Sequence, residues 1–285
     1  MRKSGILLHI SSLPSDYGIG KMGSAAYAFA DFLVDAGVQV WQILPLSPTS
    51  YGDSPYQSFS VYAGNPYFID YEQLEQEGLL TRVDYAGLIW DEDPRRVDYA
   101  HIYQYCYDVL HKAYTRFDQS DADYQSFCHQ QEAWLPEYAL FMALKNANGG
   151  KPWYLWEKPL AMHEPDAIAT AKKLYQDDIA FYCVMQYWFH KQWYKLKHYC
   201  NKRGITIVGD IPIYVAYDSV EVWSQPELFQ LDDDHVPTAV AGCPPDVFSP
   251  SGQLWGNPLY DWNYHKETNY AWWVQRLARA ATLYD

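Results

Sequence analysis

Hydrophobic residues in the first 46 positions follow a strand, helix, strand order. The apolar run Ile6–Ile10 predicts a short buried strand, and Val38–Leu44, which ends at Pro45, predicts a second one. Between them, apolar residues at helical spacing predict a helix that Ser24 caps and Gly37 ends. This order is typical of a parallel sheet in an α/β fold.

The middle of the chain combines an irregular segment with a long helical block. Residues 45–70 are rich in Ser, Pro, Gly and Tyr and predict a loop of a length that is usually functional. From 98 to 203 the pattern is helical, with breaks near 118–121 and 148–152. Because this block is too long for one crossover helix, it predicts an inserted helical subdomain. Its aromatic stretch 180–201 is interpreted as a half-buried amphipathic helix rather than a ligand site.

The C-terminal part returns to the strand and helix pattern. Ile205–Asp210 predicts a strand, Gly242–Pro258 a loop, and Lys266–Thr282 a helix that ends near Tyr284–Asp285, where another strand is expected. About three strands are convincing, whereas a β/α barrel has about eight. We therefore expect the chain to hold part of a larger fold.

Composition narrows the class of partner. The chain has 285 residues and a formal net charge of −14, which disfavours nucleic acid or an anionic membrane surface as the main partner. It contains 12 Trp, 27 Tyr and 11 Phe. Since cores prefer Leu, Ile and Val, this excess predicts that many rings lie at the surface or line a cleft. Flat amphipathic rings suit sugars.

Cysteine and histidine spacing favours neither a disulfide framework nor a metal site. The five cysteines show no paired spacing, and no nucleotide-binding, esterase or metalloprotease motif occurs. Asp232–Asp234 is interpreted as a solvated loop. The run Ile6–Ile10 contains His9 and is too short for a signal peptide, and no stretch approaches the ~20 apolar residues of a membrane span. These features predict a cytoplasmic protein.

Three clusters combine groups that could carry chemistry. Tyr51–Ser58 brings rings, a carboxylate and an amide together, which suits either sugar binding or a turn-rich surface loop. Asp210 follows a predicted parallel strand, where it could bind sugar hydroxyls or simply form a turn or helix cap. The Pro- and Gly-rich stretch Cys243–Pro258 could arch over a bound chain or be a structural loop.

At these clusters the sequence resembles the 4-α-glucanotransferases, or amylomaltases, of glycoside hydrolase family 77. The resemblance covers nearly the whole chain. The motifs that carry it are Gly5–Pro14 (GILLHISSLP), Trp41–Leu46 (WQILPL), Tyr51–Ser58 (YGDSPYQS), Gly64–Tyr67 (GNPY), Gly209–Val215 (GDIPIYV) and Trp255–Tyr260 (WGNPLY).

The resemblance implies an α/β fold of the (β/α)₈ TIM-barrel type, of which this chain would hold the N-terminal part with an inserted helical subdomain. Residues 1–97 would form the first βα units with a substrate loop, 98–203 the mainly helical insert and a barrel helix, and 204–285 further barrel elements with a loop over the cleft. It also implies transfer of α-1,4-glucan segments between malto-oligosaccharides by a retaining double displacement, without a metal or organic cofactor.

The resemblance also assigns residues to the substrate. Ser54, Tyr56, Gln57 and Asp210 match positions on the donor side of the cleft. The match places a flexible loop over the substrate, with Pro244, Pro245, Asp246, Phe248 and Trp255, and Asn257 closes that motif. Tyr51 matches a ring that stacks on glucan at a secondary surface site in some members, and Asp53 is expected to shape its loop.

One departure concerns catalysis. The family's nucleophile Asp, acid/base Glu and stabilising Asp belong to motifs that follow the last helix found here, and none occurs before Asp285. We therefore expect a C-terminally truncated, inactive copy with no catalytic residue of its own. The alternatives are a non-catalytic glucan-binding protein and a fragment of an α-amylase-like hydrolase.

Overall fold

The structure is a computed structural model that describes residues 2–50 and 52–285. Its centre is a parallel sheet in the order β1-β2-β3, formed by Gly5–Leu7, Val40–Gln42 and Thr206–Val208. Gly5 pairs with Val40, and Val40 pairs with Thr206. The parallel α/β fold predicted from the sequence is confirmed, although each strand is shorter than its apolar run.

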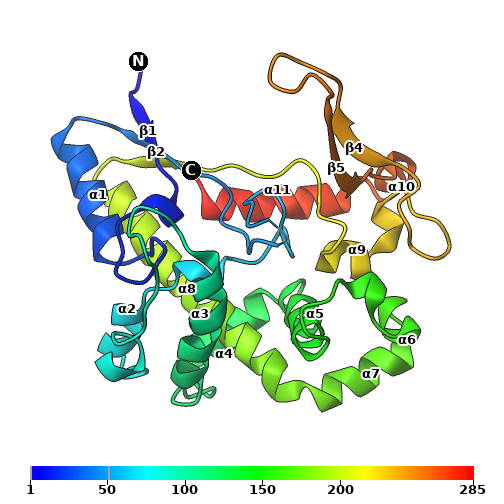
Figure 1. Cartoon of the computed structure of the whole chain (residues 1–285), viewed down its shortest axis with the longest axis horizontal. Helices are drawn as coiled ribbons and strands as arrows, with labels where there is room; N and C mark the ends of the chain where they lie inside the picture. Colours follow the sequence, from blue (N-terminus) through cyan, green and yellow to red (C-terminus); the bar gives the residue numbers. More distant parts are fainter. Residues whose placement is uncertain (1, 51) are drawn as a thin grey trace.

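Helices are the main regular structure in the remaining chain (Figure 1). They are α1 (Ser24–Asp35), α2 (Tyr71–Gln76), α3 (Tyr99–Tyr114), α4 (Ala122–Gln130), α5 (Leu135–Ala147), α6 (Lys158–Ala161), α7 (Pro165–Leu174), α8 (Gln176–Lys202), α9 (Val220–Ser224), α10 (Trp262–Glu267) and α11 (Ala271–Leu283). Short 3₁₀ turns cover Ile10–Ser12, Pro66–Phe68, Arg82–Asp84, Trp153–Leu155 and Pro226–Leu228.

The first βαβ unit forms as the sequence predicts, except that a different residue caps the start of its helix. α1 buries Ala26, Ala30 and Leu33 at a spacing of four and three residues and ends before Gly37, whose φ is 68°. Ser24 was predicted to cap α1, but the cap is Gly23. A side chain at that position would collide with Asp70, because an added Cβ would lie 2.0 Å from Asp70 Oδ2.

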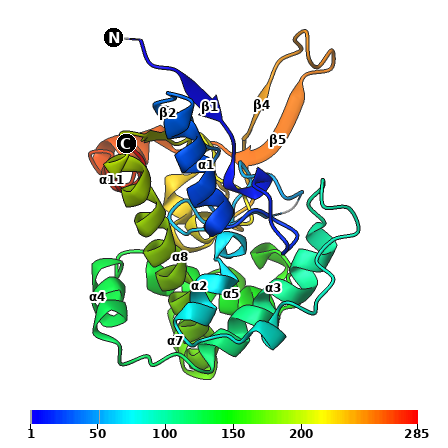
Figure 2. The same cartoon turned by 90° about the vertical axis from the view of Figure 1, so that its left-hand side faces the viewer.

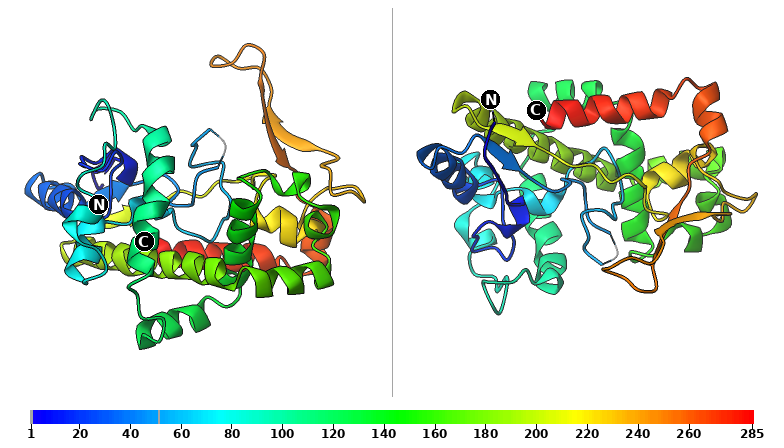
Figure 3. Two further views of the ribbon diagram at one scale, coloured as in Figure 1. Left: turned by 60° about the horizontal axis from the view of Figure 1, so that its bottom comes forward. Right: turned by 90° about the horizontal axis from the view of Figure 1, so that it is seen from above.

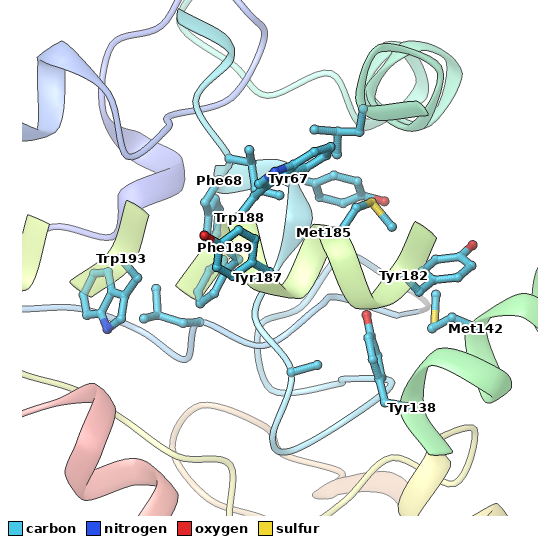
Figure 4. Close-up of a cluster of buried hydrophobic side chains, with 14 of the residues drawn as sticks. Tyr67, Phe68, Tyr138, Met142, Tyr182, Met185, Tyr187, Trp188, Phe189 and Trp193 are labelled. Carbon is cyan, nitrogen blue, oxygen red and sulfur yellow. The ribbon is translucent and has the colours of Figure 1, made fainter. Parts of the chain in front are cut away.

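The helical block centres on α8, a helix of 27 residues. The half-buried helix predicted over 180–201 is confirmed, and the predicted breaks coincide with the gaps after α3 and after α5. Figure 4 shows rings from the segment before α2, such as Phe68, packed with Trp188 and Phe189 of α8. Since α8 packs against β3 as well as α3, α4 and α5, the block shares one core with the sheet. The division at residues 97 and 203 stays a prediction.

Many aromatic rings lie in this core rather than at the surface. Five tryptophans are among the largest side chains that are almost completely buried: Trp41, Trp153, Trp188, Trp193 and Trp223. Four of them donate their indole N–H to a backbone carbonyl oxygen; Trp41, for example, donates to Leu8 at 2.7 Å, whereas Trp188 has no such partner among the described residues. The aromatic excess is therefore only in part a surface feature.

Side chains of two helices hold the irregular segment 45–70 in place. Gln186 of α8 accepts from the Gly64 amide at 2.7 Å and donates to its carbonyl oxygen at 2.8 Å. One and a half turns later, Gln192 makes the same pair of bonds to Asp70, at 2.7 and 3.1 Å. Glu221 of α9 accepts from the Val61 amide at 2.9 Å. Buried backbone groups need hydrogen-bond partners, and in this segment side chains supply the bonds that a neighbouring strand would make in a sheet.

The C-terminal part contains two corrections to the predicted elements. The predicted loop 242–258 is mostly an antiparallel hairpin of β4 (Val240–Cys243) and β5 (Gln253–Pro258), which extends away from the helices (Figure 2). Only its turn is irregular. The helix predicted over 266–282 is two helices, α10 and α11, because Asn269 and Tyr270 adopt left-handed backbone with φ of 53° and 56°.

The last helix returns the chain to the sheet. α11 lies beside α8 (Figure 3), where Trp193 Nε1 donates to the Leu283 carbonyl oxygen at 3.1 Å. The Asp285 amide then donates to the Ile207 carbonyl oxygen of β3 at 2.9 Å. This return to the edge of β3 is what a repeating β/α pattern requires.

Membrane-spanning helices are absent from the part of the chain that the structure describes, since none combines sufficient length with sufficient apolar character.

The glutamine bonds predict a large effect on stability at one α8 position. Gln186→Leu keeps the approximate volume but leaves the buried N–H and C=O of Gly64 without partners, so we expect it to lower the free energy of unfolding by about 2–5 kcal/mol. Urea denaturation followed by circular dichroism measures this. The exposed Gln176→Leu on the same helix is the control and should change stability by less than ~0.5 kcal/mol. Equal effects would contradict the assigned role of Gln186.

Candidate functional site

The substrate-loop candidates lie in a tight turn that folds back on itself. Thr49 forms an isolated antiparallel bridge with Ser58, and the backbone N–H of Gln57 donates to the Ser54 carbonyl oxygen at 3.1 Å. Ser54 Oγ also accepts from the Tyr56 amide at 3.2 Å. Ser54 therefore shapes the turn that presents Tyr56 and Gln57. Tyr51 lies outside the described residues.

Tyr56 meets Asp210 although 154 residues separate them. The Tyr56 hydroxyl donates to Asp210 Oδ2 at 2.5 Å, and this bond, with burial, raises the pKa of Tyr56 to about 12. Asp210 comes two residues after β3, at the carboxyl end of a parallel strand as predicted. Gly209 lets the backbone pass the ring of Tyr284, because an added Cβ would lie 2.1 Å from it. Asp210 therefore faces the substrate loop, and its partner is in that loop rather than in a following helix.

Gln57 meets Asn257 in the same way. Gln57 Nε2 donates to Asn257 Oδ1 at 2.9 Å, and Asn257 Nδ2 donates to the Val215 carbonyl oxygen at 2.8 Å. Asn257 is buried at the end of β5, whereas Tyr56 remains 43% exposed. The substrate loop, the segment after β3 and the hairpin thus converge on one polar cluster of Tyr56, Gln57, Asp210 and Asn257.

The predicted loop residues in the hairpin turn do not join that cluster. Asp246 accepts from the amides of Phe248 and Ser249 at 2.9 and 2.8 Å, so it shapes its own turn. Phe248 is 89% exposed, and Pro244 and Pro245 are exposed as well. No described contact joins these four residues to Tyr56 or Asp210.

Trp255 is the hairpin candidate that turns toward the body of the protein. Its ring centroid lies 6.1 Å from that of Tyr214, and its Nε1 donates to Gln253 Oε1 at 2.9 Å. It remains 43% exposed. A half-exposed indole beside a second ring provides a flat apolar surface near the cluster.

A large cavity of about 880 Å³ adjoins the other side of the substrate loop. Gly52 and Asp53 form part of its wall, and α3, α5 and α8 supply much of the rest. The sequence prediction missed its aromatic residues, which include Tyr67, Tyr103, Tyr107, Phe181 and Tyr182. The signal that could have found them is the spacing of four residues from Tyr99 to Tyr103 and Tyr107, which places these rings on one side of α3.

Charged groups complete this cavity. Lys145, which is almost fully buried, pairs with Asp218 at 2.5 Å, and His111 and Asp108 lie in the same wall. Burial also raises the pKa of Asp53. Across residues 2–50 and 52–285, no three His, Cys, Asp or Glu side chains are grouped closely enough to hold a metal ion.

Comparison with known proteins identifies the family. The sequence profile of glycoside hydrolase family 77, described as 4-alpha-glucanotransferase, matches residues 8–285. The chain belongs to this family. It is 47% identical to a 4-alpha-glucanotransferase of Clostridium butyricum over 280 residues, which is 98% of this chain and 58% of that protein. A Thermus thermophilus 4-alpha-glucanotransferase is 45% identical over 99% of this chain and 57% of its own length.

Solved structures of the family agree with the fold. An amylomaltase from Streptococcus agalactiae in complex with acarbose superposes with a TM-score of 0.96 at 47% identity, over 100% of this chain and 58% of that one. A Corynebacterium glutamicum amylomaltase, 20% identical, has the same fold with a TM-score of 0.74, over 99% of this chain and 40% of that one. This family member thus spans a little over half the length of the curated relatives named here.

The Gln57–Asn257 bond predicts energetic coupling between the substrate loop and the hairpin. Asn257→Ala should lower the free energy of unfolding by about 1–3 kcal/mol, because it strips partners from Gln57 and Val215. Combining it with Gln57→Ala should cost about 1 kcal/mol less than the sum of the two changes. Urea denaturation of all four proteins measures the cycle, with the exposed Asn263→Ala as control. Additive effects would contradict the coupling.

Proposed function

We propose that this chain provides the glucan-binding part of a 4-α-glucanotransferase, and that malto-oligosaccharides and longer α-1,4-glucans are its ligands. The observation that carries the proposal is the convergence of Tyr56, Gln57, Asp210 and Asn257 from three distant segments. A carboxylate, a phenol and amides beside a half-exposed indole are the groups that recognise sugar hydroxyls and the apolar faces of sugar rings. The 47% identity to an amylomaltase solved with acarbose supports it.

In this proposal the three parallel strands are the first strands of a (β/α)₈ barrel, and the helices between β2 and β3 form an insert. Asp210 then lies where such barrels carry their sites, beyond the carboxyl end of a strand. Because the solved amylomaltases of the family align over this whole chain, the proposal assigns residues 2–285 to the N-terminal part of that barrel.

The chemistry of transfer in this proposal is a retaining double displacement, which needs two carboxyl groups roughly 5–5.5 Å apart. Asp210 lines a small hollow beside Ser47, Arg276 and Tyr284, and no other described residue of that hollow is a carboxylate. We therefore assign Asp210 to binding and orientation of a sugar ring. The nucleophile and the acid/base are assigned to residues outside these 285, so the chain alone should not transfer glucan.

The hairpin turn in this proposal covers the bound glucan. Phe248 and Trp255 offer exposed rings, Pro244 and Pro245 restrict the backbone beside them, and Asp246 fixes the turn. A cover of this kind favours transfer over hydrolysis because it keeps water from the sugar intermediate.

A second glucan contact is proposed at the large aromatic cavity next to Gly52 and Asp53. Tyr103 is 48% exposed and its ring centroid lies 6.0 Å from that of Tyr67, so rings are available there for stacking on a glucan. The cavity wall includes residues on both sides of Tyr51 in sequence, the residue assigned to a secondary glucan site by resemblance.

The cleft assignment predicts that Asp210→Asn weakens binding of maltoheptaose at least tenfold, since a charged acceptor for sugar hydroxyls is lost. Isothermal titration calorimetry measures the affinity, and Asp233→Asn in the acidic loop is the control. The unchanged chain should release no glucose from maltotriose. Unaltered affinity in Asp210→Asn would contradict the site, and turnover that Asp210→Ala abolishes would contradict the assignment of catalysis to other residues.

The cavity assignment predicts a dependence on glucan length. Tyr103→Ala should weaken binding of amylose about three- to tenfold because a stacking ring is removed, and it should leave maltotriose binding unchanged. Affinity electrophoresis compares the two ligands, with Tyr154→Ala, a ring of similar exposure outside the cavity, as control. Equal loss for both ligands, or equal loss in both variants, would remove this cavity from the binding surface.

A further inference from the structure

The backbone that carries Asp210 has few hydrogen bonds of its own. β3 ends at Val208, whose carbonyl oxygen accepts from the backbone N–H of Ile43 at 2.9 Å. Residues 209–214 then have no regular secondary structure, and no described residue forms a backbone-to-backbone hydrogen bond with them. Beyond the strand, the position of Asp210 therefore depends on side chains that bind this segment.

Arg276 of α11 is the side chain that holds the segment. Its Nη2 donates to the Pro212 carbonyl oxygen, and its Nη1 donates to the Ile213 carbonyl oxygen at 3.3 Å. Nη1 also donates to the Tyr260 hydroxyl at 3.1 Å, and that hydroxyl donates to the same Ile213 oxygen at 2.8 Å. Two consecutive carbonyls are thus bound by the two arms of one planar guanidinium, an arrangement that the single ammonium of a lysine cannot reproduce.

Two features of the chain connect this anchor to Asp210. Pro212 has a fixed φ, and Ile211, as the residue before a proline, is restricted to extended backbone. Asp210 is therefore joined to the anchored carbonyls by a short, stiff connection, whereas its other neighbour, Gly209, leaves the backbone freer. The anchor at Pro212 thus fixes where the Asp210 carboxylate lies, and the Tyr56 hydroxyl meets it there at 2.5 Å.

Arg276 is a buried charge without a carboxylate partner. The guanidinium carbon lies 5.3 and 5.1 Å from the ring centroids of Trp272 and Trp273. The residue is 2% exposed and forms no ion pair with a described carboxylate, unlike four other arginines: Arg82, Arg95, Arg116 and Arg203. Burying a charge is costly, so an apolar side chain would fill this space at lower cost. The bonds to the two carbonyls are what the guanidinium provides in return.

We propose that Arg276 is a positioning residue for glucan binding, which fixes the segment of Asp210 so that its carboxylate faces the sugar beside Tyr56. The inference rests on the proposed function, since it concerns the same cleft. Arg276 does not contact the ligand itself, because it is almost completely buried. Its effect passes through Pro212 to Asp210, and all three residues line one small hollow.

The competing explanation is that Arg276 only stabilises the core beside α11. Its replacement would then lower stability without changing what the folded protein binds. Arg279 is the matched control for this alternative. It follows three residues later on the same helix and lines the same hollow, but its Nε donates to the Tyr62 carbonyl oxygen at 3.4 Å rather than to the segment of Asp210.

The first test is the affinity for maltoheptaose, measured by isothermal titration calorimetry on variants whose folding is checked by circular dichroism. We expect Arg276→Lys to weaken binding about fivefold, since one arm of the fork is lost, and Arg279→Lys to change it less than about twofold. Tyr260→Phe keeps the packed ring but removes the bond to Ile213, so it should weaken binding as well. It carries the test if Arg276→Lys does not fold.

The Asp210→Asn background shows whether Arg276 acts through Asp210. There, Arg276→Lys should have no further effect on affinity, because the carboxylate that it positions is already gone. An undiminished further loss in Asp210→Asn overturns the inference. An equal loss in Arg279→Lys also overturns it, because the effect is then a general one of altering α11.

A measurement without ligand separates this inference from the proposed function. The NMR signal of the Tyr56 ring, assigned by its absence in Tyr56→Phe, reports the hydrogen bond to Asp210. Arg276→Lys should move the signal in the same direction as Asp210→Asn does, and Arg279→Lys should leave it in place. This result without maltoheptaose binding supports the positioning of Asp210 while the proposed function fails. A signal that moves in neither Arg276→Lys nor Tyr260→Phe overturns the inference, even if the chain binds glucan.

Discussion

The structure depends on how a long segment with almost no regular secondary structure, residues 45–70, is kept in place. Residues 62–70 of this segment are buried, so their backbone groups cannot bond to water. Gln186 and Gln192 of α8 and Glu221 of α9 supply the partners, with bonds of 2.7 to 3.1 Å. These side chains fix the segment against the helices, and the segment in turn presents Tyr56 and Gln57.

The same constraint explains why the candidate cluster is built from three segments. The turn around Ser54 has a defined position only because both of its flanks are held, and Asp210 and Asn257 then meet it from β3 and β5. Each contact is a hydrogen bond at the surface or at the edge of the core. The geometry of the cluster therefore depends on how the helices beneath it pack. The same segment lines two separate cavities, one through Ser60 and Tyr62 and the other through Gly52 and Asp53.

The aromatic residues divide into two populations with different physical roles. Trp41 and the two tryptophans of α8 are buried, and the indole nitrogens of Trp41 and Trp193 donate to backbone carbonyl oxygens. Phe248, Trp255 and Tyr103 are exposed or half-exposed beside the hairpin and the large cavity. The amino-acid composition alone gives only the total number of aromatic residues. Which rings contact solvent depends on how the helices are arranged around the sheet.

The sequence by itself determined the local elements and the family. The βαβ start, the end of α1 at Gly37 and the presence of a helix over 180–201 follow from periodicity and from glycines, because these features depend on neighbouring residues. The motifs around Tyr51–Ser58, Asp210 and Trp255 sufficed to indicate the glucanotransferases. The position of Asp210 after a parallel strand also followed from the sequence, because strand ends in such sheets share one edge.

Only the tertiary structure decided which of those residues meet. Tyr56 and Asp210 are 154 residues apart and Gln57 and Asn257 are 200 apart, so no local pattern could pair them. The hairpin of β4 and β5 was missed because its strands are exposed and stabilised by each other rather than by alternating apolar residues. The large aromatic cavity was missed because its walls come from segments whose proximity depends on packing, and packing is not encoded in any single stretch of the chain.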